Sequence, residues 1–428
     1  MRITIHRGAK EIGGSCVEIR SDRAKILIDF GLPLDFGDKT REEQVQIRKQ
    51  AAEWAEDADA IFISHYHADH FGLLTESDRR TPLFMTRGTY EMLCVNDIVQ
   101  RKSVTQNARI VVVPPYKDCF VQIGDIRVSL YTVDHAAFDA CAFLIECGGR
   151  KVLYSGDIRL HSVKGKLYHL LPQGVDCLLL EGTNLNADKK CKTESQIGKE
   201  FEQQFRKEAD KLHYVWCSGQ NIDRLVQLYK AALHTGRKLI IDTYIALILD
   251  RVHGVRNSIP SILDPIDGHD VFRYFNEKDY LEKIKQSGDI TTADKLNALP
   301  TVDTGDISRN PGKYVWVVRP KMLPVMHKYR YAPSVFVTSL WGGYREKESA
   351  LLEHLQKYSI PEIEIHTSGH ADMQSLQQIV EHVKPKCLIP IHTETPRHFS
   401  EVFPNNEVLF LNDGEEFDTE NHKDFISK

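Results

Sequence analysis

The sequence predicts an α/β protein in which one domain is inserted into another. Its 428 residues exceed what a single hydrophobic core usually holds. From Met1 to about Leu185, short apolar or alternating runs end in glycine turns, which favours strands. From Glu194 the apolar period becomes helical, and strands then alternate with helices as in a parallel α/β domain. The predicted domains are a first part at 1–190, an insert at 191–362 and a return segment at 363–428.

Composition narrows the class of protein. No apolar run approaches the length of a membrane span, and Met1 leads directly into a predicted strand, so neither a membrane contact nor a signal peptide is expected. The nine cysteines include no Cys-x-x-Cys pair, which favours reduced core thiols in a cytoplasmic protein.

The net charge of −5 excludes a general attraction to nucleic acid, so such a partner requires a local basic surface. The candidates are Lys321, His327, Lys328 and Arg330, with Arg224 and Arg345 elsewhere in the chain. Taken one at a time, these charges are more simply explained as solvated surface.

Two short apolar runs near the N-terminus are each followed by polar residues. The first, Lys25–Ile28, precedes Asp29, and the second, 60–63, precedes Ser64-His65-Tyr66-His67-Ala68-Asp69-His70. Alternating histidines on an extended stretch point the same way, so His65 and His67 are expected to bind one ion. Asp69 and His70 follow at a turn and are expected to reach a second ion. Imidazole and carboxylate without thiolate are typical of a catalytic Zn²⁺, or of Mn²⁺ or Fe²⁺.

Further residues of the same types follow later strands. The predicted strands at 126–131 and 152–154 precede His135 and Asp157, and a short strand beginning at 387 precedes His392. A strand that ends in Asp or His is common, so each of these alone is weak. The pattern by itself therefore leaves open whether these residues join the histidine run in one site.

The remaining elements are predicted in order along the chain. A helix is expected at 90–99, the only one in the first part, and a second at 194–211. After a strand at 214–217, Asn221 is expected to cap a helix that Gly236 closes. Strands are expected at Lys238–Asp242 and 334–339, with helices and loops over 264–310.

The pattern His-x-His-x-Asp-His resembles the metallo-β-lactamase superfamily. The resemblance implies an αββα sandwich, with Asp29 supporting the metal site from outside. The long stretch between Asp157 and His392 resembles the inserted α/β domain of the β-CASP nucleases. Its motifs match Leu178 to Asn184, with Glu181, and His366 to Asp372, with His370. The wording Ser-Gly-His-Ala at 368–371 and the stretch 218–224 are most similar to the ribonuclease J family.

The resemblance implies a site with two Zn²⁺ ions per chain, with Mn²⁺ as the alternative. One ion would be held by His65, His67 and His135, the other by Asp69, His70 and His392, with Asp157 between them. Two such ions, roughly 3.5–4 Å apart, activate a water molecule for attack on a phosphodiester. Asp69 would also take part in catalysis.

His370 would be the general acid, and Glu181 would orient His370 or His392. Alternatively, Glu181 is a strand end bonded to backbone amides. Ser368, Gly369 and Arg224 are expected to hold substrate, although Ser368 and Gly369 also suit a simple strand-to-helix turn.

The expected function is that of a ribonuclease J-like exonuclease, endonuclease or both, acting on single-stranded RNA. A small-molecule metallo-hydrolase of the thioesterase or lactonase type, a DNA-acting β-CASP nuclease and a catalytically silent scaffold are the alternatives. His392 favours RNA, since DNA-processing relatives tend to lack this histidine. The sequence ends at Lys428, without the C-terminal domain usual in ribonuclease J, and has Thr393 where glycine is common. The oligomeric state therefore stays open, a homodimer included.

Overall fold

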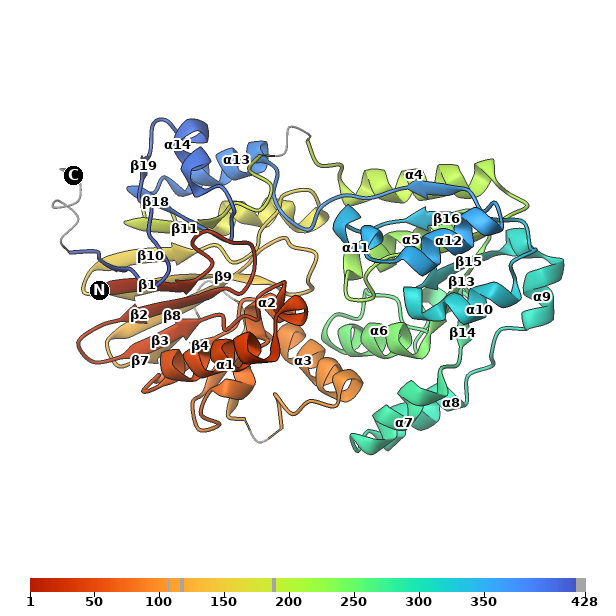
Figure 1. Ribbon diagram of the computed structural model, residues 1–428, viewed down its shortest axis with the longest axis horizontal. Coiled ribbons are helices and arrows are strands. Elements are labelled where there is room, and N and C mark those ends of the chain that lie inside the picture. The colour runs from red at the N-terminus through yellow and green to blue at the C-terminus, as the bar shows by residue number, and fades with distance from the viewer. Residues whose placement is uncertain (107, 116–118, 187–189, 421–428) are drawn as a thin grey trace. The chain divides into compact units, whose positions relative to one another are not determined.

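The computed structural model describes residues 1–106, 108–115, 119–186 and 190–420. The chain divides into two compact units (Figure 1). The first unit contains Met1–Asp97, Ser103–Lys190 and Gly369–Lys428, and the second contains Ile98–Lys102 and Cys191–Ser368. Among the described residues, the helices are all too short or too polar to cross a membrane.

The first unit contains two seven-stranded sheets that share a hydrophobic core. Ile26 and Phe62 of one sheet and Phe143 and Leu179 of the other belong to this core. The first sheet, in spatial order, comprises β20 (Glu416–Asp418), β1 (Arg2–Arg7), β2 (Cys16–Arg20), β3 (Lys25–Ile28), β4 (Ala60–Phe62), β5 (Leu83–Met85) and β6 (Ile110–Val112). The second comprises β19 (Glu407–Val408), β18 (Cys387–Ile391), β11 (Cys177–Glu181), β10 (Arg150–Tyr154), β9 (Cys141–Cys147), β8 (Ile126–Thr132) and β7 (Phe120–Ile123).

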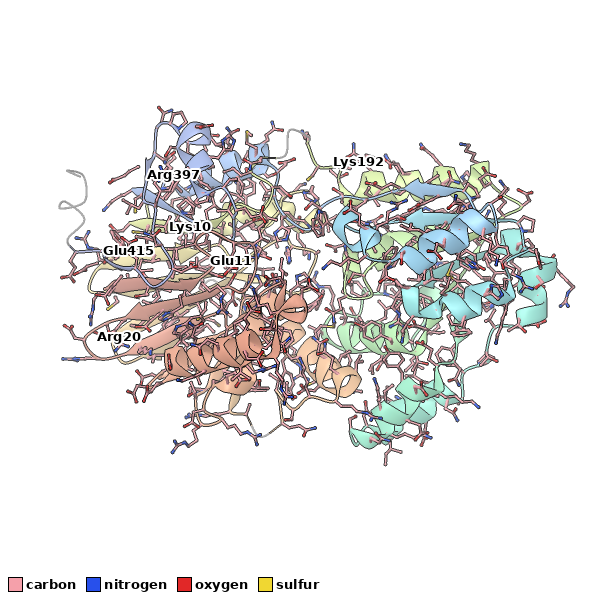
Figure 2. The ribbon with its side chains drawn as sticks, viewed as in Figure 1. Lys10, Glu11, Arg20, Lys192, Arg397 and Glu415 are labelled. Atoms are coloured by element: carbon pink, nitrogen blue, oxygen red, sulfur yellow. The ribbon has the colours of Figure 1, made fainter. Side chains whose placement is uncertain are left out.

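Helices cover the outer faces of this sandwich, so the predicted αββα architecture is confirmed (Figure 1). Leu376 and Ile379 of one helix pack with Leu178 and Leu388 in a second core. Charged side chains such as Lys10 and Arg397 project from the unit's surface (Figure 2). The helices are α1 (Arg41–Ala55), α2 (Ala68–Phe71), α3 (Arg87–Gln100), α13 (Met373–Val383) and α14 (Phe399–Val402), with 3₁₀ turns at Phe36–Asp38, Leu74–Glu76, Val163–Leu170 and Pro396–His398.

The expectation of a single helix in the first part of the chain was wrong. The helix expected at 90–99 forms α3, but α1 was not predicted. Only Ile47, Ala51 and Ala55 of α1 are buried, so its apolar stripe is too thin to recognise by periodicity. The sequence nevertheless contained a start pattern, because Thr40 and Glu43 form a capping box.

The second unit is a parallel sheet with helices between its strands, as the alternating pattern predicts. All its strand pairs are parallel. In spatial order the strands are β14 (Phe272–Phe275), β13 (Lys238–Asp242), β15 (Tyr314–Val318), β12 (Leu212–Trp216), β16 (Ser334–Thr338) and β17 (Glu362–Glu364). The helices are α4 (Glu194–Lys207), α5 (Ile222–His234), α6 (Thr243–Val255), α7 (Lys278–Gln286), α8 (Ile290–Asn297), α9 (Thr304–Arg309), α10 (Leu323–Lys328), α11 (Gly342–Glu346) and α12 (Ser349–Lys357), with 3₁₀ turns at Ile266–Gly268, Pro311–Lys313 and Pro320–Met322. Asn221 caps α5 as expected, since its side chain accepts from the Arg224 amide.

The return segment adds β18 and β19 at one edge of the second sheet. Strand β18 pairs in parallel with β11, with Glu181 opposite Ile391. This register places the residue after β18, His392, beside the end of β11, although the two strands are far apart in sequence. Parallel neighbours end at the same edge of a sheet, so polar residues after both strands meet there.

Candidate metal centre

The loops after β4, β8, β10 and β18 bring the predicted metal ligands together. Three groups of residues have potential ligand atoms within 4.8 Å of one another. They are His65, His67, His135 and Asp157; Asp69, His70 and His392; and Asp157, His370 and His392. Asp157 belongs to the first and third groups, and its Oδ2 also lies 3.3 Å from His70 Nε2 in the second.

The local backbone of the histidine run differs from the expected extended stretch. Strand β4 ends at Phe62, and His65 and His67 lie in an irregular loop, while Asp69 and His70 lie on the single turn of α2. The backbone of a distant segment holds this run, since the Ser15 amide donates to the Asp69 carbonyl at 2.9 Å. The run is thus not a regular strand, but His67 has extended backbone angles, and Asp69 and His70 lie on a turn as expected.

Asp29 accepts four hydrogen bonds at the base of the cluster. Its carboxylate accepts from the amide and hydroxyl of Ser64 at 2.7 and 2.8 Å, from Tyr154 Oη at 2.7 Å and from His70 Nδ1 at 2.7 Å. Its backbone has a φ of 57°, which aspartate tolerates better than most residues. A carboxylate bonded to the Nδ1 of a ligand histidine fixes the ring and exposes Nε2.

Three further imidazoles are oriented in the same way. Nδ1 of His65 lies 3.0 Å from the Ser64 hydroxyl, Nδ1 of His135 lies 2.7 Å from the Gly369 carbonyl, and Nδ1 of His392 lies 2.9 Å from the Thr183 hydroxyl. A carbonyl can only accept, so His135 carries its proton on Nδ1 and offers Nε2 as a lone pair. His67 is different, because its Nδ1 faces His135 Nε2 at 3.2 Å.

The distances between donor atoms fit metal coordination. Two ligands of one tetrahedral ion, each about 2.0–2.1 Å from it, are about 3.3 Å apart. The observed separations include 3.2 Å between His67 and His135, and 3.3 Å for both His70 Nε2 to Asp157 Oδ2 and His392 Nε2 to Asp69 Oδ2.

The unsatisfied atoms point to the same conclusion. Among the predicted ligands, the buried atoms His65 Nε2, His70 Nε2 and Asp157 Oδ1 make no hydrogen bond in the described structure. Buried polar atoms without a partner are costly and rare. A divalent cation at this position would satisfy all three, so the residues fit a metal centre.

The charge states of His65, His67, His135 and Asp69 suit a cation. Burial lowers the pKa of His65 and His135 well below the usual value and that of His67 to about 4, so these rings are neutral at pH 7. Burial alone would raise the pKa of Asp69, but the neighbouring His70 and His392 outweigh it and lower the pKa to about 2. Neutral imidazoles and charged carboxylates are the forms that bind metal. Burial alone would lower the pKa of His70, but Asp157, Asp29 and Asp69 outweigh burial and raise this pKa well above its usual value, so a metal ion would have to displace the proton.

Glu181 and His370 lie together at the edge of the cluster. Glu181 Oε1 lies 3.5 Å from His370 Nδ1, and its Oε2 accepts from the Thr183 amide at 2.8 Å. Glu181 therefore fits both expectations: it contacts a histidine that it could orient, and it accepts hydrogen bonds from backbone amides. Burial disfavours the charged imidazole, but Asp157 and Glu181 outweigh burial and raise the pKa of His370 to about 9 in the protein without bound ions.

The three residues expected to hold substrate have different environments. Gly369 supplies the carbonyl that orients His135, and a Cβ there would lie 3.1 Å from that of Ala136. Ser368 is half-buried at the end of the second unit.

The expectation for Arg224 was wrong. The side chain is fully buried in the second unit. It donates to both carboxylate oxygens of Glu194, at 3.2 and 3.3 Å, and to Ser339 and the Thr367 carbonyl. A buried guanidinium with these partners is a structural ion pair, so it has no donor to offer a ligand.

We expect Arg224→Met to lower the free energy of unfolding by about 3–5 kcal/mol, because it removes the guanidinium that pairs with the buried carboxylate of Glu194. The measurement is denaturant unfolding of the full chain. The double variant Arg224→Met with Glu194→Leu should recover much of the loss, since no charge is then left alone. A single variant that weakens RNA binding at unchanged stability would contradict this role.

Sequence reasoning missed the residues that orient the ligands. Ser64, Tyr154 and Thr183 each contact Asp29 or His392, yet a hydroxyl near a motif is too common to identify one. Asp134 was also missed, although it directly precedes His135. It accepts from the buried Arg159 at 3.1 Å and from Ser162, which anchors the loop after β8.

Comparison with known proteins agrees with this geometry. Residues 25–213 match the beta-lactamase superfamily domain, and residues 362–401 match the Zn-dependent metallo-hydrolase RNA specificity domain. A crystal structure of a protein of unknown function from Enterococcus faecalis V583 superposes with a TM-score of 0.72 at 18% identity, covering 97% of this chain and 99% of that one. At this identity the likeness shows a common fold. These matches show that the chain contains a metallo-β-lactamase domain and an RNA specificity domain of the Zn-dependent metallo-hydrolase type.

Over most of its length the chain is also similar to ribonuclease J enzymes of several bacteria. Ribonuclease J of Mycoplasma genitalium is 24% identical over 90% of this chain and 67% of its own length. The enzyme of Mycoplasma pneumoniae is 23% identical over 95% and 73%, and that of Helicobacter pylori strain 26695 is 22% identical over 97% and 60%.

Proposed function

We propose that this protein is a metal-dependent ribonuclease that hydrolyses phosphodiester bonds in single-stranded RNA. The observation that carries the proposal is the position of Asp157. Its carboxylate lies 3.6 Å from His65 Nε2, 3.3 Å from His70 Nε2 and 3.8 Å from His392 Nε2, so one side chain reaches both groups of ligands. The similarity to ribonuclease J and the match to an RNA specificity domain support RNA as the substrate.

We propose two divalent ions, Zn²⁺ or alternatively Mn²⁺, held on one side by His65, His67 and His135 and on the other by Asp69, His70 and His392. When bound, such ions acidify a water molecule toward a pKa of about 7 and offset charge on the phosphate. The chain's own contribution is to fix the ligands. Asp29, Thr183 and the Gly369 carbonyl hold the rings by their Nδ1 atoms.

The leaving 3′-oxygen of RNA is a poor leaving group and needs a proton. His370 is the proposed donor, because its side chain is 20% exposed at the edge of the cluster and its Nδ1 lies 3.5 Å from Glu181 Oε1. The Glu181 carboxylate would favour the protonated ring from its buried side. Asp69, as a ligand opposite His392, would help to hold the site in its reactive form.

The test is incubation of the Zn²⁺- or Mn²⁺-loaded chain with single-stranded RNA and DNA labelled at the 5′ or the 3′ end. The proposal predicts RNA cleavage that stops on chelation and returns with metal. Mononucleotide released from only one label marks an exonuclease and its direction, whereas internal fragments from both labels mark an endonuclease. Hydrolysis of thioesters or lactones with RNA left intact, or cleavage of DNA alone, would overturn the proposal.

A further inference from the structure

The second unit carries basic and aromatic residues at the amino edge of its sheet. Strands β16 and β17 are parallel neighbours, with Phe336 opposite Glu362. The segment from α10 into β16 and the segment from α12 into β17 therefore meet at this edge (Figure 1). Both helices are anchored in one core, through Met326 and Leu355 among others.

Aromatic rings connect the two segments. The ring of His327 lies 5.7 Å from that of His354 and 5.6 Å from that of Tyr358. Tyr331 meets Tyr358 edge-on at 6.1 Å and an angle of 89°. Tyr331 is nevertheless 80% exposed, so most of its ring faces solvent. A large ring held by neighbours and left open is more typical of a contact surface than of a core.

Cations surround these rings without acidic partners. Arg330 lies 4.6 Å from the Tyr331 ring centre, and Lys357 lies 5.6 Å from that of Tyr358. Lys328 is exposed at the end of α10. Within the described ranges, none of these three cations forms an ion pair. Two of them act on one group, since burial first, and then His327, Lys357 and Arg330, lower the pKa of His354.

The opposite edge of the same sheet shows a contrasting arrangement. There Arg319 pairs with Asp242 and Glu277, and Lys321 pairs with Glu277 at 3.2 Å. Those cations are neutralised within the protein. The cations at the amino edge are available to an external anion. On α12, the helix that carries Lys357, Glu353 is the one acidic residue, and it is exposed.

We infer that Tyr331, Tyr358, Lys328, Arg330 and Lys357 form a binding surface for single-stranded RNA, here called the basic–aromatic patch. Proteins generally bind single strands by stacking bases on exposed aromatic rings and by placing cations beside the phosphates of the backbone. A second copy of this chain would bring like charges together across a symmetric contact, which disfavours that occupant. The inference rests on the proposed function and adds a place where RNA is held apart from the metal cluster.

The test compares binding of a fluorescent phosphorothioate-linked 30-nucleotide RNA to full-length variants over a range of salt concentrations. The triple variant Lys328→Gln, Arg330→Gln, Lys357→Gln should make the slope of log affinity against log salt shallower by about 2, at about 0.7 per phosphate contact. The matched control Lys199→Gln, Lys207→Gln, Lys230→Gln removes the same charge from exposed positions of α4 and α5 and should leave the slope unchanged.

A second pair of variants tests the ring. Tyr331→Ala should weaken binding by about tenfold through the lost stacking, whereas Tyr331→Phe should bind as the unchanged chain does. Hydrolysis of bis(p-nitrophenyl) phosphate should be equal in all of these variants, because none touches the metal cluster.

The inference is wrong if the two triple variants have equal salt slopes and Tyr331→Ala binds RNA normally. That result would not contradict the proposed ribonuclease activity. A change in oligomeric mass in the patch variants at unchanged RNA affinity would also overturn it, in favour of a contact between copies. If the unchanged chain neither binds nor cleaves RNA, the proposed function fails first, and this inference with it.

Discussion

Replacing Asp157 with alanine should remove most of both metal ions and lower RNA cleavage by about 10³-fold or more. Asp157 is the one carboxylate of the cluster that lies within 4 Å of ligand atoms from both groups of histidines in the described structure. Metal ions supply several kcal/mol of transition-state stabilisation, and each 1.36 kcal/mol is a factor of ten in rate. Metal content by mass spectrometry and cleavage of labelled RNA measure the two effects.

The matched control for this experiment is Asp176→Ala. Asp176 is also an aspartate of the first unit, but it pairs with Lys386 at 2.7 Å, outside the cluster. This variant should keep both metal and activity. Asp157→Asn tests charge without loss of volume and should also lose metal, because the amide is a weaker ligand. Two ions per chain retained in either Asp157 variant would show that Asp157 is not shared.

Replacing His370 with alanine should lower RNA cleavage by about 10²–10⁴-fold at unchanged metal content. The ring is partly exposed and lies beside Glu181, so its proposed part is to give a proton to the leaving oxygen. A p-nitrophenyl phosphodiester has a leaving oxygen that needs no proton. We expect its hydrolysis to fall less than about tenfold.

The two substrates and the metal content separate the roles that His370 could have. A fall in metal content would make it a ligand, as its inclusion in one group with Asp157 and His392 allows. A fall in stability with loss of both activities would make it a core residue. His169→Ala, which changes an exposed histidine of the same unit, should alter none of these quantities. RNA cleavage at the original rate would remove His370 from the mechanism.

The ligand residues were predictable because metal binding restricts chemistry and position together. His135, Asp157 and His392 each follow an apolar strand, and strands that end at one edge of a sheet bring their following residues together. The parallel sheet of the second unit was predictable for a similar reason, since the change from strand to helix period is a local property of the sequence.

The features that could not be predicted depend on tertiary contacts, which local sequence patterns do not contain. The histidine run forms a loop and one helical turn instead of a strand, because Asp29 and the backbone of Ser15 hold it. Arg224 has the pattern of a ligand-binding arginine, but its burial beside Glu194 depends on how α4 and α5 pack. The pairing of Tyr331 with Tyr358 depends on the register of two strands and has no counterpart in a local pattern.

The central claim is that two ions share Asp157 in a site built from both groups of histidines. Anomalous diffraction at the zinc edge, from crystals of the Zn²⁺-loaded protein, tests it most directly. The account predicts two peaks per chain, one beside His65, His67 and His135 and one beside Asp69, His70 and His392, with Asp157 between them. The claim would be contradicted if crystals of fully active protein showed no anomalous peak within this cluster.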